Sequence, residues 1–506
     1  MQEPGSYPNL ASRFEATDLY AQRKMPKRQA SPTLRLLAFS RQDVRGASGR
    51  EDSMTATQQT RSPEGSGLDS YFKLSERGTS VGTEVRAGVT TFLVMSYIIF
   101  VNPSILSAAG FDGPAVAAAT ALVAGLLTIL MGVVANYPIA MAAGLGINAA
   151  VAFGLVLGDG LTPAGAMGVI VLEGLIVTAL VVVGLREAIM NAIPMSLKRA
   201  IGVGIGLFIL FIGFVSGGLI APGEGVIVQF VFPNARGPLL TLIGLVIAVF
   251  LYVRRVKGAF IISILITTVI ALIMGVSTIP AEFVVTPSFA TLGQFDLGNV
   301  FTQLGYVAAA LTIFSFLLTD FFDTIGTATA VLEEAGLTEE NGEIPGVSKL
   351  LLVDSIGAVA GGAAGVSSNT SYIESAAGVA EGGRTGLTSI VTGVLFLLAV
   401  FLSPLAGLVP AQATAPVLIM VGFLMSGLIK GIDFDDVEEG LPALFAIILM
   451  PLTFSITVGI GAGFVMYTVV KIFRGKTGDV HPLMWVVTVA FIVYFAQAWL
   501  GTAISA

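Results

Sequence analysis

Long apolar runs separated by short polar loops make up the chain from about residue 88 to the C-terminus. Each run is about 20 residues long, enough for a helix to cross a hydrocarbon core of roughly 30 Å. The polar and apolar alternation typical of barrel strands is absent. We therefore predict an all-α protein that crosses the membrane many times. The predicted spans lie near 88–107, 114–135, 139–157, 164–184, 199–219, 237–253, 258–277, 306–331, 347–364, 385–403, 413–430, 441–457 and 459–474.

Two stretches interrupt this pattern, at 142–154 and 365–383, because both are rich in glycine or small polar residues. Such segments expose backbone groups that lipid cannot satisfy, and they are tolerated only inside protein or beside a wet cavity. Interrupted helices usually mark the binding site of a transporter. A faint repeat, in which a proline precedes a glycine-bearing apolar run after Ile193 and again after Val409, predicts two inverted halves.

The basic residues predict the orientation of these spans. With a cytoplasmic N-terminus the inner loops hold most of them, whereas the outer loop 278–305 holds none, as the positive-inside rule requires. A last apolar stretch at 483–500 is either a further span or an interfacial helix anchored by Trp485 and Trp499. The inner basic residues are Arg186, Lys198, Arg199, Arg254, Arg255, Lys257, Lys349, Arg384 and Lys430.

Residues 1–84 differ from the rest because they are polar, locally basic and without hydrophobic periodicity. This composition predicts a disordered N-terminal tail. Nothing in it has the pattern of a secretory signal peptide. The alternative is that the tail is an upstream extension and that the protein starts at Met54.

Composition and charge exclude several classes of function. The chain is 55% hydrophobic and 12% charged, with a net charge of -7 carried largely by acidic loops, which argues against nucleic acid as a partner. The absence of cysteine excludes disulfides and thiol chemistry. The single histidine, His481, leaves no histidine cluster for a metal site or a hydrolytic triad.

Carboxylates occur where the pattern predicts membrane. Asp320 and Asp323 lie in the run 306–331, and an acidic residue at that depth is costly and usually functional. Their spacing puts them on one helix face, which Thr324 extends. Glu374 lies in the second interrupted segment, beside Ser375.

These groups suit a flat heterocycle as ligand. Carboxylates accept hydrogen bonds from ring N–H groups, and Asn148, which follows Gly146 in the first interrupted segment, both donates and accepts. Tyr372 has an aromatic ring that can stack on such a base. A carboxyl group at this depth can take up a proton from one side and release it on the other. The pattern therefore predicts proton-coupled uptake.

Other interpretations stay open at this point. Asp320 either binds the base or only modulates Asp323, and the isolated Glu173 and Asp354 favour structural pairing. A transporter of the same architecture for uracil, xanthine or an inorganic anion is the alternative, although paired carboxylates would repel an anion. An ion channel would need a continuous polar lining. No nucleophile and base stand out, so an enzyme is not expected.

Several strings resemble a known family, the hypoxanthine/guanine/adenine permeases, which are the AzgA-like branch of the nucleobase/cation symporter-2 (nucleobase:ascorbate transporter) family. Among them are "TEVRAGVTTFLVMSYIIFVNPSIL", "ANYPIAMAAGLGINAAVAFG", "DFFDTIGT" and "SYIESAAGVAEGGRTGLTSIVTGVL". The resemblance covers about residues 80 to 500. It does not extend to the N-terminal tail.

The resemblance implies about fourteen helices in two inverted halves, with the third and tenth helices broken. It also implies a core domain at 85–184 and 306–403, which holds the substrate. A gate domain at 185–305 and 404–506, the latter including the C-terminal hydrophobic segment, often dimerises. Transport then moves the core against the gate like an elevator.

The resemblance also implies roles for individual residues. Asp323, Glu374 and Asn148 match the acidic or polar positions of the eighth, tenth and third helices, and Asp320 matches a commonly acidic position. The expected cargo is hypoxanthine, adenine or guanine, imported across the plasma membrane by proton symport through Asp323 and Glu374. No cofactor is expected, and Na⁺ coupling stays open. The full set of predicted substrate-binding residues is Asp323, Glu374, Asn148, Asp320, Thr324, Gly146, Tyr372 and Ser375.

Overall fold

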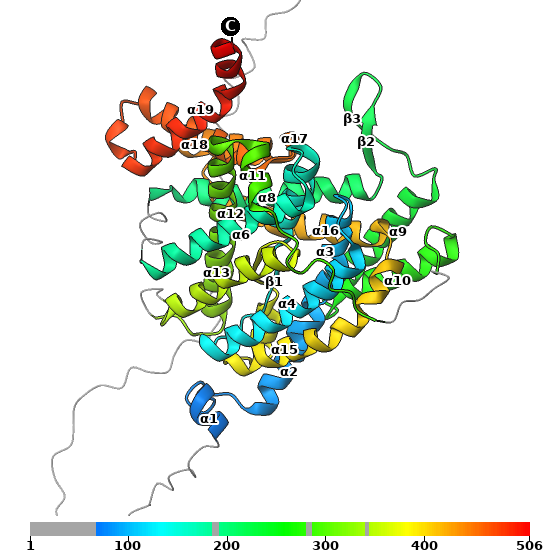
Figure 1. Cartoon of the computed structure of the whole chain (residues 1–506). Helices are drawn as coiled ribbons and strands as arrows, with labels where there is room; N and C mark the ends of the chain where they lie inside the picture. The colour runs from blue at the N-terminus through cyan, green and yellow to red at the C-terminus, as the bar shows by residue number, and fades with distance from the viewer. Residues whose placement is uncertain (1–66, 185–191, 280–285, 340–343, 506) are drawn as a thin grey trace, which may run out of the picture. The chain divides into compact units, whose positions relative to one another are not determined.

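The computed structural model describes residues 67–184, 192–279, 286–339 and 344–505, and these are predominantly helical (Figure 1). Within them, ten helical segments are long and apolar enough to cross a membrane. The prediction of a polytopic helical protein is therefore confirmed. Arg186 and the first 66 residues, including Met54, lie outside the described residues.

The helices follow one another along the chain with short connections. The first half contains α1 (Gly67–Phe72), α2 (Val81–Met95), α3 (Ile98–Ser107), α4 (Gly113–Val134), α5 (Leu145–Ala149), a π-helix (Ala150–Gly158), α6 (Pro163–Val182), α8 (Met195–Ser216), α9 (Arg236–Val253), α10 (Ala259–Met274) and α11 (Leu297–Leu304). The second half contains α12 (Tyr306–Glu334), α13 (Val347–Ala364), α14 (Ser375–Ala380), α15 (Gly386–Ala399), a 3-10 helix (Val400–Leu408), α16 (Ala411–Met425), a 3-10 helix (Ser426–Gly431), α17 (Val437–Thr453), α18 (Ile456–Phe473), a 3-10 turn (Thr477–Asp479) and α19 (Pro482–Ser505).

The two short helices expected at 441–457 and 459–474 are present as α17 and α18. The apolar stretch 483–500 lies in α19, which packs on α18. The Phe464 and Phe491 ring centroids are 6.2 Å apart, and the hydroxyls of Thr468 and Thr488 are 2.8 Å apart. Whether α19 crosses the membrane stays a prediction.

The predicted boundary of the tail is wrong for residues 67–84. Helix α1 and the start of α2 lie in that range. The Tyr71 hydroxyl donates to the carbonyl of Val133 over 2.7 Å, and Arg77 donates to the carbonyl of Asn136 over 2.6 Å. Local composition missed these helices because contacts with residues far along the chain stabilise them.

The two interrupted segments pair with each other. Strand β1 (Met141–Ala143) runs antiparallel to β4 (Asn369–Ser371), with Ala142 opposite Thr370. The ladder gives hydrogen-bond partners to backbone groups that no helix satisfies at these positions. The interruptions predicted at 142–154 and 365–383 are confirmed, whereas their pairing was not predicted.

The contacts between loops agree with the predicted sidedness. On the side rich in basic residues, Arg77 also donates to the carbonyl of Arg384 over 2.9 Å. The loop without basic residues makes other contacts: the amide of Asp296 donates to the carbonyl of Ala164 over 2.8 Å, and that of Gly293 to Ala363 over 2.7 Å. Which side faces the cytoplasm stays a prediction.

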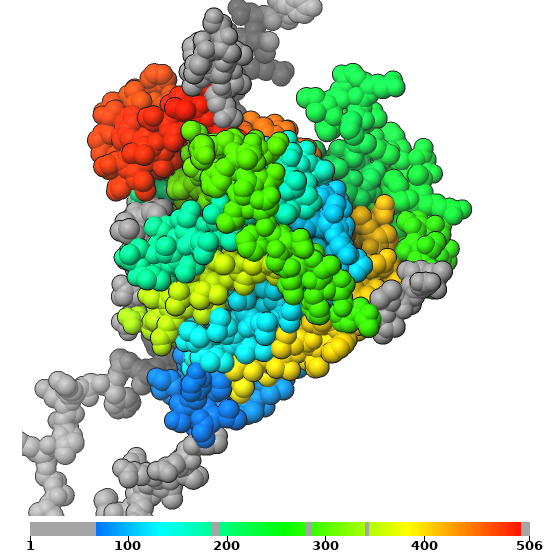
Figure 2. Space-filling model, in the orientation of Figure 1, coloured from blue at the N-terminus to red at the C-terminus, as the bar shows by residue number. Residues whose placement is uncertain are grey.

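A hairpin between α8 and α9 extends beyond the helices. Strands β2 (Ile220–Gly223) and β3 (Val226–Phe230) pair antiparallel. Strand β3 is exposed along its whole length, and the hairpin stands out in green in Figure 2.

Glycine allows α4 and α15 to pack with their backbones in contact, and Figure 1 shows them side by side. A Cβ atom on Gly393 would lie 2.6 Å from the carbonyl oxygen of Gly125 and 2.7 Å from the side chain of Ile129. Neither backbone can yield without separating the helices. This crossing therefore requires glycine at residue 393.

Gly393→Ala should destabilise the protein by about 1–3 kcal/mol, the usual cost of overpacking. The thermal unfolding midpoint of the detergent-solubilised protein measures it. Gly82→Ala is the matched control, because a Cβ at Gly82 in α2 has no atom within 4 Å. Equal midpoints for the two variants would contradict the proposed close contact.

Candidate functional site

Asp323 and Glu374 come together although they lie on different elements. Asp323 is on α12, and Glu374 immediately precedes α14. Both side chains are half-buried, and their charges are close enough to interact. The hydroxyl of Tyr97 donates to Oε1 of Glu374 over 2.5 Å. The structure thus brings together the two acids that the sequence singled out.

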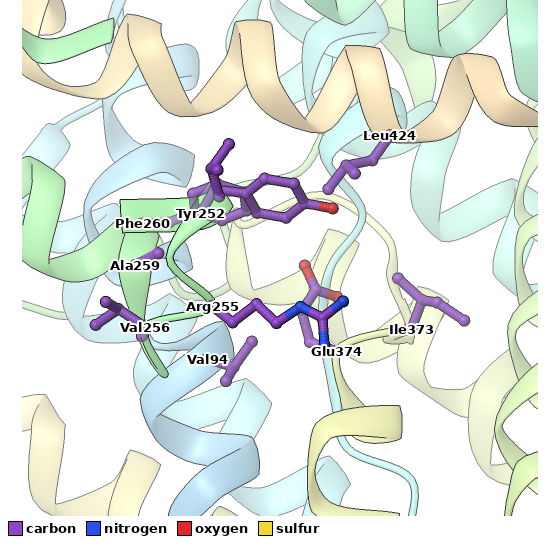
Figure 3. Close-up of a pocket in the computed structure, with 11 residues that line it drawn as sticks. Val94, Tyr252, Arg255, Val256, Ala259, Phe260, Ile373, Glu374 and Leu424 are labelled. Carbon is purple, nitrogen blue, oxygen red and sulfur yellow. The ribbon is translucent and has the colours of Figure 1, made fainter. Parts of the chain in front are cut away.

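A cavity of about 550 Å³ reaches Glu374 (Figure 3). Its walls are mainly apolar and aromatic, and Figure 3 shows the rings of Tyr252 and Phe260 side by side. Arg255 adds a positive charge to the wall. A mainly apolar cavity with a few polar groups is typical of a small-molecule site. The lining residues are Val94, Tyr252, Val253, Arg255, Val256, Gly258, Ala259, Phe260, Ile373, Glu374 and Leu424.

Asn148 is fully buried on α5. Neither its side-chain oxygen nor its side-chain nitrogen has a hydrogen-bond partner among the described residues. A buried amide without partners costs about 1–3 kcal/mol for each group. This unsatisfied amide is consistent with the predicted role of Asn148 as a ligand of the substrate.

Asp354 is the anchor of the second interrupted segment. One of its oxygens accepts from the amide and the hydroxyl of Ser371, both over 3.0 Å, and the other accepts from the hydroxyl of Thr324 over 2.5 Å. Thr324 also lies 2.8 Å from the hydroxyl of Thr370. The structural pairing predicted for Asp354 is confirmed, and the Thr324 hydroxyl is occupied in holding β4 to α12.

Three other predicted binding residues also make contacts inside the protein. Asp320 is 1% exposed and accepts from the hydroxyl of Ser368 over 3.0 Å. The Tyr372 hydroxyl donates to the carbonyl of Ala143 over 2.5 Å, and the Ser375 hydroxyl accepts from an amide of the first segment over 2.9 Å. These contacts hold the two interrupted segments together.

Gly146 faces another helix. A Cβ atom at this position would collide with the side chain of Ile205 on α8. Gly146 therefore permits close packing of α5 on α8, and its role in binding substrate stays a prediction.

Tyr97 is the residue that the sequence analysis missed. It is fully buried and lies between the end of α2 and the start of α3. A single tyrosine in an apolar run gives no periodic signal. Only the contact with Glu374 across the fold identifies it.

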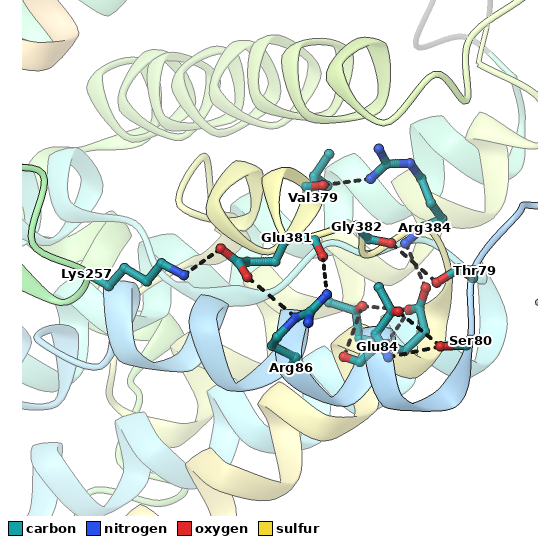
Figure 4. Close-up of polar contacts among 11 residues, drawn as sticks. Thr79, Ser80, Glu84, Arg86, Lys257, Val379, Glu381, Gly382 and Arg384 are labelled. Carbon is teal, nitrogen blue, oxygen red and sulfur yellow. Dashed lines mark hydrogen bonds and ion pairs between the residues drawn. The ribbon is translucent and has the colours of Figure 1, made fainter.

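Charged residues hold the end of α14 on the basic side of the protein (Figure 4). Buried Glu84 accepts from the amides of Arg384 and Thr388, over 2.9 and 3.1 Å. Glu381 accepts from Lys257 over 2.5 Å and lies 3.5 Å from Arg86. The hydrogen bond from Lys257 holds the pKa of the Glu381 carboxyl below its usual range. This pair links the α9–α10 loop to α14, beside the cavity.

A helical membrane protein with carboxylates between two interrupted helices belongs to the class of membrane transporters. Residues 82–462 match the sequence profile described as Permease family, Xan_ur_permease. The chain belongs to this family of permeases, and it is a transporter rather than an enzyme.

Two curated relatives illustrate the similarity. The guanine/hypoxanthine permease PbuG of Bacillus subtilis strain 168 is 43% identical over 441 residues, covering 85% of this chain and 99% of PbuG. The adenine permease AdeP of Escherichia coli K12 is 41% identical over 433 residues, covering 84% of this chain and 95% of AdeP. The resemblance seen in the sequence is confirmed.

Solved transporters share the fold. The transmembrane domain of the cyanobacterial bicarbonate transporter BicA superposes with a TM-score of 0.56 at 18% identity. The match covers 75% of this chain and 96% of that domain. At this identity the likeness concerns the fold alone.

Proposed function

We propose that the protein imports purine nucleobases, namely hypoxanthine, guanine and adenine, by proton symport across the plasma membrane. The observation that carries the proposal is the convergence of Asp323 and Glu374 from two elements, with Glu374 at a cavity of about 550 Å³. The names of the relatives PbuG and AdeP support purines as the cargo.

The chemistry of the site fits a purine base. Carboxylates accept hydrogen bonds from ring N–H groups, and the unsatisfied amide of Asn148 can both donate and accept. Aromatic side chains in the cavity wall offer faces for a flat ring. Charges fixed on both carboxylates would repel at this distance. Uptake of a proton together with the base relieves that repulsion, which is the physical basis of the proposed symport.

The proposed mechanism is alternating access of the elevator type, with a cytoplasmic N-terminus. Helices α2 and α4 pack on α15, and α6 packs on α13, whereas α16 and α17 pack on α8. This grouping supports a core domain at 85–184 and 306–403 and a gate domain formed by the rest, related as two inverted halves. The gate is proposed to form a homodimer.

Uptake of labelled bases tests cargo and coupling together. In cells without their own permeases, the protein should raise hypoxanthine, guanine or adenine uptake at least about tenfold, a conservative margin for an active permease. A protonophore should abolish the gain, and replacing Na⁺ should not. Uptake confined to uracil or xanthine would overturn the cargo, and purine uptake indifferent to the protonophore would overturn the coupling.

A further inference from the structure

Tyr97 makes two contacts that meet at the acidic site. Its hydroxyl donates to Oε1 of Glu374 over 2.5 Å. Its ring meets that of Phe260 on α10 edge-on, with centroids 5.6 Å apart and an interplanar angle of 88°. Phe260 in turn stacks on Tyr252, at a centroid distance of 6.2 Å. The ring of Tyr97 is therefore fixed by packing while its hydroxyl holds a carboxylate.

No other hydroxyl near Glu374 has its hydrogen available in the same way. Tyr372 interacts electrostatically with Glu374, but its own hydroxyl hydrogen goes to the carbonyl of Ala143. Asp323 carries no donor when charged, and Arg255 lies in the cavity wall. Tyr97 is thus the buried donor that orients this carboxylate from inside the protein.

Orientation matters here because a glutamate side chain has several rotatable bonds. A free carboxylate at the cavity would lose rotamer entropy on binding a base. A hydrogen bond from a rigid, packed donor makes that loss before the substrate arrives, which is preorganisation. A hydrogen bond to a charged group contributes about 1.5–3 kcal/mol, more than one between neutral groups.

Building on the proposed function, we propose that Tyr97 is a positioning residue that orients Glu374 for the purine base. Phe260 holds the ring of Tyr97 in place. Tyr97 itself acts through Glu374 and not by direct contact with the substrate.

Tyr97→Phe tests the hydroxyl alone, because it keeps the ring packed on Phe260. The KM for hypoxanthine should rise about tenfold, while Vmax per molecule at the surface changes less than about twofold, since one charge-assisted hydrogen bond is lost. Tyr71→Phe is the matched control. It also removes a hydroxyl bonded over 2.7 Å, to the carbonyl of Val133, and should leave KM and Vmax unchanged. An unchanged KM for Tyr97→Phe would overturn the inference.

A double-mutant cycle separates positioning from a general packing role. In purified protein carrying Glu374→Gln, adding Tyr97→Phe should change the Kd for hypoxanthine by less than about twofold, because coupled residues give non-additive effects. A further tenfold loss there would show that Tyr97 acts independently of Glu374, which contradicts the inference. If wild-type protein binds and transports no purine, the proposed function fails instead. If wild-type transports purines and only Tyr97→Phe is without effect, the inference alone fails.

Discussion

Asp323→Asn is expected to abolish purine uptake without loss of the protein from the membrane. Asparagine has nearly the same size, so α12 keeps its packing. It carries no charge, however, and turns an N–H group toward the N–H groups of the base, which then lose their acceptor. Losing one or two charge-assisted hydrogen bonds at about 1.5–3 kcal/mol each lowers binding roughly 10- to 1,000-fold. Uptake of labelled hypoxanthine, normalised to surface expression, measures the loss.

Asp320→Asn is the matched comparison on the same helix. Asp320 is 1% exposed and bonds to Ser368, whereas Asp323 is half-buried and interacts with Glu374. The Asp320 variant should therefore keep measurable uptake. A loss equal to or larger than that of Asp323→Asn would reverse this ranking, and normal uptake by the Asp323 variant would show that the base binds elsewhere.

Glu374→Gln is expected to abolish accumulation of purines while weakening their binding only about tenfold, the effect of losing one charge-assisted bond. Glutamine keeps one carbonyl oxygen as acceptor for the base. It cannot take up and release a proton, so the proton gradient no longer drives uptake. The two effects are measured with purified protein, as the Kd for hypoxanthine, and in proteoliposomes, as hypoxanthine accumulation driven by an imposed pH gradient.

Glu381→Gln serves as the control for this variant. Glu381 is also an acid near α14, but it pairs with Lys257 at the protein surface and does not line the cavity among the described residues. A surface pair contributes about 0–1 kcal/mol, so its removal should leave gradient-driven accumulation intact. Proton-driven accumulation by Glu374→Gln at the wild-type level would exclude Glu374 as the proton carrier.

The acidic part of the site was predictable because a carboxylate within an apolar run is costly wherever it lies. Asp323, Glu374 and Asp354 were each identified in this way. Their separate tasks were not predictable. Asp354 anchors β4 through Ser371, while Glu374 reaches the cavity, and nothing in the local sequence distinguishes those two environments.

The amino-acid sequence by itself determined the helical membrane class, the approximate spans and the two interruptions, because these follow from local hydrophobicity and from glycine content. Tertiary structure alone decided that β1 pairs with β4, that residues 67–84 are helical in part, and that Tyr97 holds Glu374. Each of these depends on groups that lie far apart along the chain. Their free energy arises only when the fold brings them within contact distance, so no local pattern records it.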